Sequence, residues 1–274
     1  MASELHDKAA EAVAEHRRWI EAAGRFGFAT KGVVYGIIGV LAVVAAWRGG
    51  RAEGSEGAIR EIGQQPFGQL LLWLVAAGMA GYALWQIIQA LTGSDRRGSA
   101  WMIRLRRGGF LISSAVHVAL AVYAAPVSIG RLRGESRKGL VEGMLSLPGG
   151  QILVSVVGAL IIGFACWEIY RAWSQKFMQD YQLHEMDEAR RNTALYTGIV
   201  GLAARGVTFL IVGIFVIIAA VRLDPSQAKG FGEALEVLAR QPFGPWLLAI
   251  VGVGFICYAV NCGALALYRR FAVR

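Results

Sequence analysis

Six apolar runs, each almost free of charged residues, follow one another along the chain. Each is close to the roughly 20 residues that an α-helix needs to cross a bilayer. None alternates between apolar and polar positions, as the strands of a membrane barrel do, so all six are predicted to be helices. The third is the most polar, because it contains Ser113, Ser114 and His117. The runs are 33–47, 70–91, 111–129, 152–167, 196–221 and 246–267.

Polar positions repeat three times along these runs. Lys31, Ser113 and Arg205 each stand at the start of an odd-numbered run, and a proline at position 66, 148 or 242 stands 35, 35 or 37 residues further on. A spacing kept so closely across unlike sequences indicates an internal repeat. Each proline belongs to a marker that precedes an even-numbered run: Gln65-Pro66-Phe67-Gly68, Leu147-Pro148-Gly149-Gly150 and Gln241-Pro242-Phe243-Gly244.

The connection inside each copy carries apolar residues at positions i, i+1 and i+4, which suit a short amphipathic helix on the outer surface of the membrane. These residues are Ala58, Ile59 and Ile62, then Leu140, Val141 and Met144, then Ala234, Leu235 and Leu238. Proline suits the first turn of a helix, so the marker is expected to begin the next span.

The predicted fold is an all-α integral membrane protein with six transmembrane helices in three tandem hairpin repeats. Every copy has two spans, so successive copies enter the membrane in the same orientation and are expected to surround a pseudo-threefold axis. Glycines at helical spacing, such as Gly39 and Gly213 in equivalent positions, suit close helix packing or oligomerisation. The expected boundaries are 1–23 for a cytoplasmic amphipathic N-terminal segment, 24–92 for repeat 1, 93–173 for repeat 2, 174–195 for a cytoplasmic linker helix and 196–274 for repeat 3.

Composition agrees with a membrane protein. Of the 274 residues, 55% are hydrophobic and 17% are charged, whereas soluble domains have about 25% charged residues. The net charge of +9 is explained by basic loops at lipid headgroups, and no separate basic domain suggests nucleic-acid binding. Cys166, Cys257 and Cys262 all lie within expected spans and lack the spacing of metal ligands. We therefore expect no metal, no cofactor and no disulfide.

The distribution of lysine and arginine predicts the orientation. The side that holds both termini and the loops 92–110 and 173–195 receives 18 of these residues, and the opposite side receives 10. Because lysine and arginine are enriched in cytoplasmic loops, both termini are expected in the cytoplasm.

Ionisable residues inside a span are costly and are therefore candidates for function. Odd spans enter the bilayer where even spans leave it, so the polar residues at these ends are expected to share one layer in the inner leaflet. The candidates for ligand or partner binding are Glu168, His117, Lys31, Arg205, Gln86 and Asn261. None of them is proposed as catalytic.

Two of these residues have alternative interpretations. Glu168 either pairs with Arg171 one turn along its own helix or forms a buried pair with Lys31 or Arg205 of another span. His117 is either a packed histidine with one hydrogen-bonded partner or a haem ligand or proton relay, and a single histidine is a weak signal for either of the latter roles.

Three motifs resemble bacterial membrane proteins of the domain-of-unknown-function family 1206. They are Lys31-Gly32-Val33-Val34-Tyr35, Pro66-Phe67-Gly68 and Gly81-Tyr82-Ala83-Leu84-Trp85. The resemblance covers roughly residues 24–270 and implies three two-helix repeats in a bacterial plasma (inner) membrane. The middle copy departs most, with Ser113-Ser114 for Lys-Gly and Gly149 for Phe, and the third has Asn261 for Trp. The resemblance implies no activity.

The sequence favours a membrane scaffold or accessory binding subunit with an inner-leaflet polar site. A transporter for a small solute or ion, working through an inner-facing pocket, is the alternative, because parallel repeats occur in transporters. The nearly apolar outer half of the spans argues against an open channel. No Ser/His/Asp arrangement, phosphate-binding loop or carboxylate pair suggests an enzyme. The expected partners are membrane lipids, together with another protein or a second copy of the chain.

Overall fold

The structure is a computed structural model that describes residues 17–48, 54–64, 66–92, 100–128 and 137–269. Residues 1–16 of the expected N-terminal segment lie outside the described residues. Six helices are long and apolar enough to cross a membrane, so this is a multi-pass membrane protein, as predicted. They are α2 (Arg17–Arg48), α4 (Gly68–Thr92), α5 (Ala100–Ser128), α7 (Gly150–Trp173), α8 (Glu188–Arg222) and α10 (Gly244–Tyr268).

A short helix precedes each even-numbered span, as the apolar spacing predicted. These are α3 (Ser55–Gln64), α6 (Arg137–Leu145) and α9 (Phe231–Ala239). Ala58, Ile59 and Ile62 are buried in the first, and Ala234 and Leu235 in the third. In the second, Val141 and Met144 pack against a smaller apolar cluster between α7 and α8, and Leu140 lies outside the described side chains.

The marker forms a tight turn that joins each short helix to the following span. The residue after proline, Phe67, Gly149 or Phe243, has a left-handed backbone with φ of 62°, 76° or 62°. The next residue is always glycine, because a Cβ there would lie 2.4, 2.1 or 1.9 Å from a carbonyl oxygen at the end of the short helix. The proline therefore lies in the turn before the span. The sequence had suggested that it lies in the first turn of the span.

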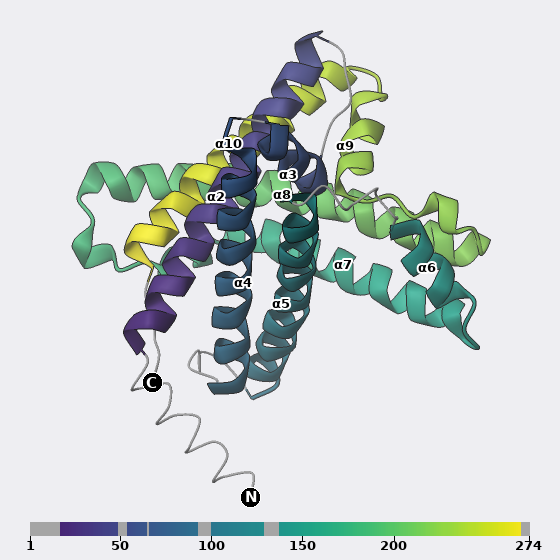
Figure 1. The fold of residues 1–274 in the computed structure, drawn as a ribbon, viewed down its shortest axis with the longest axis horizontal. Helices are drawn as coiled ribbons and strands as arrows, with labels where there is room; N and C mark the ends of the chain where they lie inside the picture. The colour runs from purple at the N-terminus through teal and green to yellow at the C-terminus, as the bar shows by residue number, and fades with distance from the viewer. Residues whose placement is uncertain (1–16, 49–53, 65, 93–99, 129–136, 270–274) are drawn as a thin grey trace, which may run out of the picture.

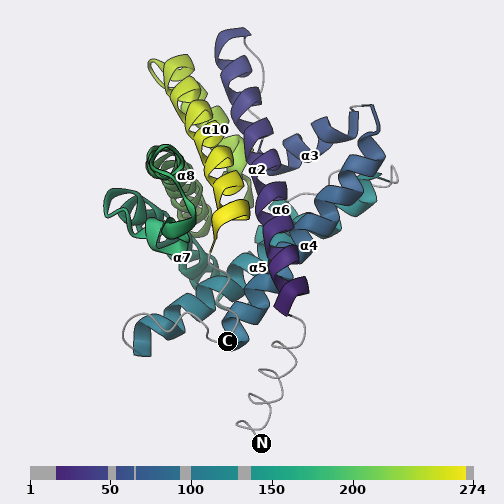
Figure 2. The same cartoon turned by 90° about the vertical axis from the view of Figure 1, so that its left-hand side faces the viewer.

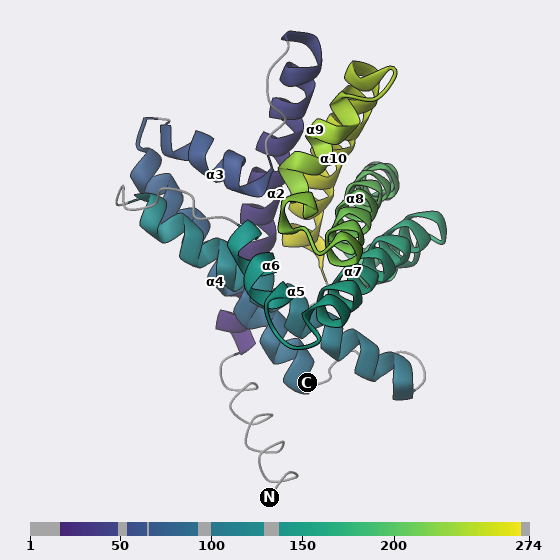
Figure 3. The same ribbon diagram turned by 90° about the vertical axis from the view of Figure 1, so that its right-hand side faces the viewer.

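The most extensive contacts pair the even span of one repeat with the odd span of the next. These pairs are α4 with α5, α7 with α8, and α10 with α2. The two helices of a pair run side by side, and the three pairs point in widely different directions in Figures 1 and 3. The α10 and α2 pair brings the third repeat against the first, as Figure 2 also shows. The ring closure that the sequence predicted is therefore present, but the tightest contacts lie between repeats and not within the hairpins.

The three interfaces use equivalent residues. Two aromatic rings meet in each: Tyr82 with His117 at 4.6 Å between centroids, Phe164 with Phe209 at 5.3 Å, and Tyr258 with Tyr35 at 4.8 Å. Two glycines also face each other in two of them. A Cβ on Gly39 would lie 2.6 Å from the Gly252 oxygen, and one on Gly213 would lie 3.1 Å from the Gly158 oxygen. These matching contacts are what a pseudo-threefold arrangement of repeats requires.

The second repeat departs from this symmetry. In the first and third repeats the two spans also pack on each other, α2 on α4 and α8 on α10, whereas α5 and α7 are not among the packed helix pairs of the described chain. In the most apolar window of α5 and of α7 only 22% of the residues are buried, against 44–50% in the other four spans.

The connection between the second and third repeats differs from the predicted linker helix over 174–195. It consists of two short 3₁₀ turns, η1 (Lys176–Asp180) and η2 (Leu183–Glu185), and α8 begins at Glu188. The segment folds back on the helix bundle, since Phe177, Tyr181 and Met186 are buried. Asp187 caps α8 by accepting a hydrogen bond from the Arg190 amide at 2.8 Å.

Candidate functional site: a buried polar cluster where the repeats meet

Arg205 on α8 lies at the centre of the polar cluster. Its side chain is buried, and its Nη1 lies 3.3 Å from Glu168 Oε2 and donates a hydrogen bond to the Tyr258 hydroxyl. Four aromatic rings surround the guanidinium at 4.7–5.7 Å from their centroids, a distance at which cation–π attraction is significant. The rings belong to Tyr35, Phe164, Phe209 and Tyr258.

Glu168 on α7 is 2% exposed and pairs with two arginines. Its Oε2 faces Arg205 of the next repeat, and its Oε1 accepts a hydrogen bond from Arg171 Nη1 at 3.4 Å. The interior pair predicted for Glu168 is therefore confirmed with Arg205. The helical pair with Arg171 is present as well, so the two interpretations are not exclusive, because each carboxylate oxygen takes one guanidinium.

The network continues from Arg171 to the segment 174–187, which joins α7 to α8, and to the end of α10. Arg171 Nη2 lies 3.1 Å from Asp180 Oδ2, and Arg269 Nη2 lies 3.9 Å from the same oxygen. The Arg269 guanidinium in turn lies over the rings of Phe28 and Trp85, at 4.8 and 4.6 Å. Charges from the second and third repeats thus reach aromatic rings of the first.

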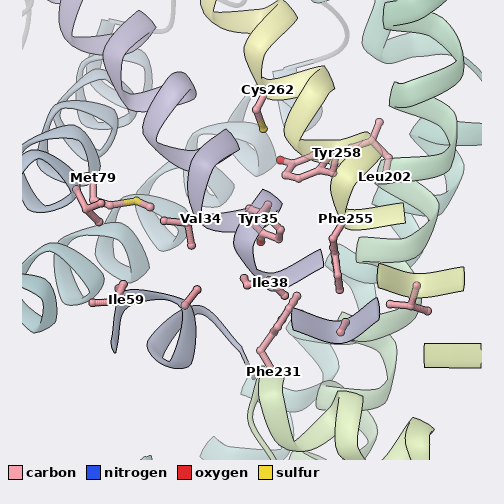
Figure 4. Close-up of a cluster of buried hydrophobic side chains, with 14 of the residues drawn as sticks. Val34, Tyr35, Ile38, Ile59, Met79, Leu202, Phe231, Phe255, Tyr258 and Cys262 are labelled. Carbon is pink, nitrogen blue, oxygen red and sulfur yellow. The ribbon is translucent and has the colours of Figure 1, made fainter. Parts of the chain in front are cut away.

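Lys31 on α2 occupies the position of Arg205 in the first repeat. Its Nζ lies 3.4 Å from the Tyr82 hydroxyl and over the rings of Tyr82 and Tyr258, at 4.8 and 5.6 Å. Among the described residues no carboxylate forms an ion pair with this buried ammonium. The residue equivalent to Glu168 here is Cys262, which lies beside Gly32. Figure 4 shows Cys262 and Tyr258 on α10 beside Tyr35 on α2.

The interfaces thus differ at one pair of equivalent positions. The α7 and α8 interface holds the Glu168 and Arg205 ion pair. The α4 and α5 interface holds a hydrogen bond from Gln86 Nε2 to the Ser113 hydroxyl at 2.7 Å. The α10 and α2 interface leaves Lys31 with a thiol and no acid.

His117 and Asn261 have structural partners. His117 Nδ1 lies 2.7 Å from the Ser113 carbonyl oxygen, and its ring packs on Tyr82. This is the packed histidine with one hydrogen-bonded partner. Asn261 Nδ2 donates to the Tyr181 hydroxyl at 2.7 Å and to the Ala194 carbonyl at 3.2 Å. Asn261 therefore fixes the segment 174–187 against the start of α8 and the end of α10. Burial raises the pKa of Tyr181 and keeps its hydroxyl neutral.

The cluster is covered on two sides. On the side of the short helices, Phe231 of α9 packs against the rings of Tyr35, Phe209 and Phe255, with centroids 5.3–6.1 Å apart. On the side of the termini, the segment 174–187 covers it with the buried side chains of Phe177 and Tyr181. These contacts cover the cluster at both ends of the pseudo-threefold axis around which the three repeats are arranged.

Sequence analysis did not identify the tyrosines as part of the site. Tyr82, Phe164 and Tyr258 are equivalent residues of the even spans, and the first and third place a hydroxyl next to Lys31 and Arg205. Aligning the three copies around Gly81-Tyr82 would have revealed this pattern. No sequence signal pointed to Asp180, because its partners Arg171 and Arg269 come together only when the loop folds back.

The chain matches the family described as Domain of Unknown Function (DUF1206) three times, over residues 26–93, 108–175 and 200–269. It belongs to this family. Uncharacterized protein YxxB of Bacillus subtilis (strain 168) is 32% identical over 257 residues, which are 93% of this chain and 94% of that protein. No solved structure matches the chain.

The three DUF1206 segments coincide with the three structural repeats, each beginning in or near an odd span and ending just after an even span. Residues 176–199 lie between the second and third segments. They hold most of the covering segment 174–187 and the first turns of α8. Lys31, Glu168 and Arg205 all lie within the matched segments, one in each of the three.

Proposed function

We propose that the protein is an accessory or binding subunit of the bacterial plasma membrane, without catalytic activity, and that its central polar cluster is a ligand site in the inner leaflet. The observation that carries this proposal is the buried ammonium of Lys31, which has no carboxylate partner among the described residues. A buried charge is normally paired, because desolvation without compensation is costly. A ligand that supplies the missing partner would account for its retention.

The other groups of the cluster support binding better than catalysis. Both carboxylate oxygens of Glu168 are engaged by guanidinium groups, Oε1 by Arg171 and Oε2 by Arg205. His117 has its Nδ1 engaged by a main-chain carbonyl. No nucleophile of the described residues stands beside either group in the arrangement that covalent catalysis needs.

Transport of a small solute is a second candidate, supported by the two covers of the cluster. Phe231 and the segment 174–187 close it from opposite sides, and each belongs to an element that is peripheral to the spans. Alternate opening of the two covers would expose a central site to either side, as in transporters built from repeats. This candidate predicts solute exchange by the reconstituted protein that depends on Lys31.

Native mass spectrometry tests the binding proposal. Wild type, Lys31→Met and a control, Lys176→Met, are purified from the same bacterial membrane in the same mild detergent. Lys176 is exposed, and its ammonium bonds the Tyr170 hydroxyl, which is not part of the polar network. We expect an adduct on wild type and Lys176→Met that Lys31→Met lacks. Identical adducts on all three, or none on wild type, would contradict the proposal.

A further inference from the structure

We propose that the ligand of the central cluster is a membrane lipid with an acidic headgroup, which enters sideways between α5 and α7. This inference rests on the proposed binding function and specifies the ligand and its route. Two independent features support it: an excess of positive charge with unused donors at the centre, and an open face between the two spans of the second repeat.

The charge of the network is not balanced within the described chain. Four cations, Lys31, Arg171, Arg205 and Arg269, stand against two carboxylates, Glu168 and Asp180, which leaves an excess of two positive charges. Arg171 and Arg269 are partly exposed near the loop, so water screens them. Lys31 and Arg205 are buried, so an anion beside them would offset the deeper excess charge.

Unused donors lie around this charge. The Lys31 ammonium has three N–H groups and one hydroxyl acceptor. Arg205 Nε is buried and has no hydrogen-bond partner among the described residues. Lys31, Arg205 and Tyr35 keep 5%, 7% and 8% exposure while their apolar neighbours Ile38 and Cys262 keep 0%. The Lys31 ammonium and the Arg205 guanidinium both lie over the Tyr258 ring, so an acidic group beside that ring would lie next to both cations.

The open face of the second repeat appears when three sets of equivalent positions are compared, beginning with a glycine that all three repeats share. In the first repeat a Cβ on Gly27 would lie 2.5 Å from Tyr82, and in the third a Cβ on Gly201 would lie 2.6 Å from Tyr258. Gly109 is the equivalent residue of the second repeat, and nothing lies within 4 Å of its Cβ position. The glycines become the packing surface only when the facing span can approach.

Bulky residues prevent that approach between α5 and α7. Gly78 meets Thr30 in the first repeat and Gly254 meets Ala204 in the third. The equivalents in the second repeat are Leu160 and Ile112, which are 54% and 57% exposed. Large side chains have replaced both members of the close contact, so the spans remain apart.

This face leads from the bilayer to the cluster. Phe164 lies on it, is 39% exposed, and also contacts the Arg205 guanidinium at 5.4 Å. Along the ring axis the cluster is covered by Phe231 and by the segment 174–187. The apolar side chains of Ile112, Val116 and Leu160 are exposed in the second repeat and suit contact with an acyl chain. An acidic lipid headgroup would accept hydrogen bonds from the donors, and its acyl chain would contact the apolar side chains of this face.

Thermal unfolding of the full chain in detergent tests the proposal. Phosphatidylglycerol is titrated against phosphatidylcholine with the same acyl chains, and inorganic phosphate is added in a separate arm at matched ionic strength, because exposed charges are screened by salt. We expect phosphatidylglycerol alone to raise the melting temperature. Lys31→Met should weaken its apparent affinity about 10- to 100-fold, the effect of one lost charged hydrogen bond.

Two further variants separate the site from the route. Cys262→Glu places a carboxylate where the equivalent interface has Glu168, and it should abolish the lipid effect because Lys31 is then paired internally. Gly109→Leu adds a bulky side chain to the open face, at a position where an added Cβ has no atom within 4 Å, and it should weaken lipid binding. Gly143→Leu on α6, where an added Cβ is equally unobstructed, should leave lipid binding unchanged.

Three results would overturn the proposal. The first is that phosphatidylcholine stabilises the wild type as much as phosphatidylglycerol does. The second is that inorganic phosphate stabilises Gly109→Leu as much as phosphatidylglycerol stabilises the wild type. The third is that Lys31→Met and Cys262→Glu both bind phosphatidylglycerol as the wild type does. A lipid titration without effect, combined with a different adduct that requires Lys31 in native mass spectrometry, would reject the lipid but retain the binding function. A lipid titration without effect, together with no adduct that requires Lys31, would reject both the lipid and the binding function.

Discussion

At the scale of single residues, one pair of positions is occupied in three different ways. Glu168 with Arg205, Gln86 with Ser113, and Cys262 near Lys31 hold equivalent places in the three interfaces. The repeat fold therefore tolerates an ion pair, a neutral hydrogen bond or an unpaired cation. The cost of charge in a membrane allowed the sequence to predict that Glu168 faces inward towards a base. It did not distinguish Lys31 from Arg205, since both stand at the same repeat position and only the order of the helices around the ring separates them.

Glu168→Gln should reduce the free energy of unfolding by about 3–5 kcal/mol, because it leaves the buried Arg205 charge uncompensated. Arg171→Gln should cost about 0–1 kcal/mol, because its ion pairs are partly exposed to solvent. Unfolding by titration with a denaturing detergent measures both changes. In a double-mutant cycle Glu168 should couple more strongly to Arg205 than to Arg171. A silent Glu168→Gln, or coupling to Arg171 alone, would show that the interior pair contributes nothing.

At the scale of helices, the faces that meet are set by small residues in equivalent positions. The sequence correctly predicted six spans, three short helices and tight packing at Gly39 and Gly213. It suggested hairpins as the main packing units, whereas the most extensive contacts join successive repeats. Glycines line both faces of α2 and α8, so spacing alone does not rank the faces. The separation of α5 from α7 depends on Ile112 and Leu160, which look like ordinary apolar residues of a span until the three copies are compared.

Gly39→Ala should destabilise the protein by about 1–3 kcal/mol, because the new methyl group would lie 2.6 Å from the Gly252 oxygen and force α2 and α10 apart. Gly109→Ala makes the same chemical change where nothing lies within 4 Å. It should be neutral or stabilising by up to about 1 kcal/mol, since alanine favours a helix over glycine. Thermal unfolding in detergent compares the two. Equal effects at both sites would show that the α2 and α10 contact is not close.

Tyr181→Phe should loosen the segment 174–187 with a loss of about 0.5–1.5 kcal/mol, because it removes the hydrogen bond with Asn261 that fixes this loop. Hydrogen–deuterium exchange should rise in peptides that contain 176–186 and stay constant in α4. Tyr196→Phe is the matched control, since Tyr196 is exposed on α8. Uniform exchange changes in both variants would mean that the loop does not depend on Asn261.

At the scale of the whole molecule, six successive membrane crossings place α3, α6 and α9 on one side and the start of α2 and the end of α10 on the other. The basic bias of 18 to 10 predicts that the termini are cytoplasmic. Cysteines introduced at Ser55, Ser136 and Ser226, in a chain without its native cysteines, should react with an impermeant reagent from outside the cell. Ser136 lies outside the described residues, but the other two begin or precede short helices on that side. Labelling of any one from the cytoplasm alone would contradict this topology.

The central claim is that the α10 and α2 interface repeats the α7 and α8 interface but leaves Lys31 without a carboxylate. A double-mutant cycle of Cys262→Glu and Lys31→Met measures this most directly, by unfolding of the four proteins in lipid-free detergent. If the interfaces are equivalent, Cys262→Glu costs less in the presence of Lys31 than in Lys31→Met, with a favourable coupling of the size found for Glu168 and Arg205. An equal cost of Cys262→Glu in both backgrounds would contradict the account.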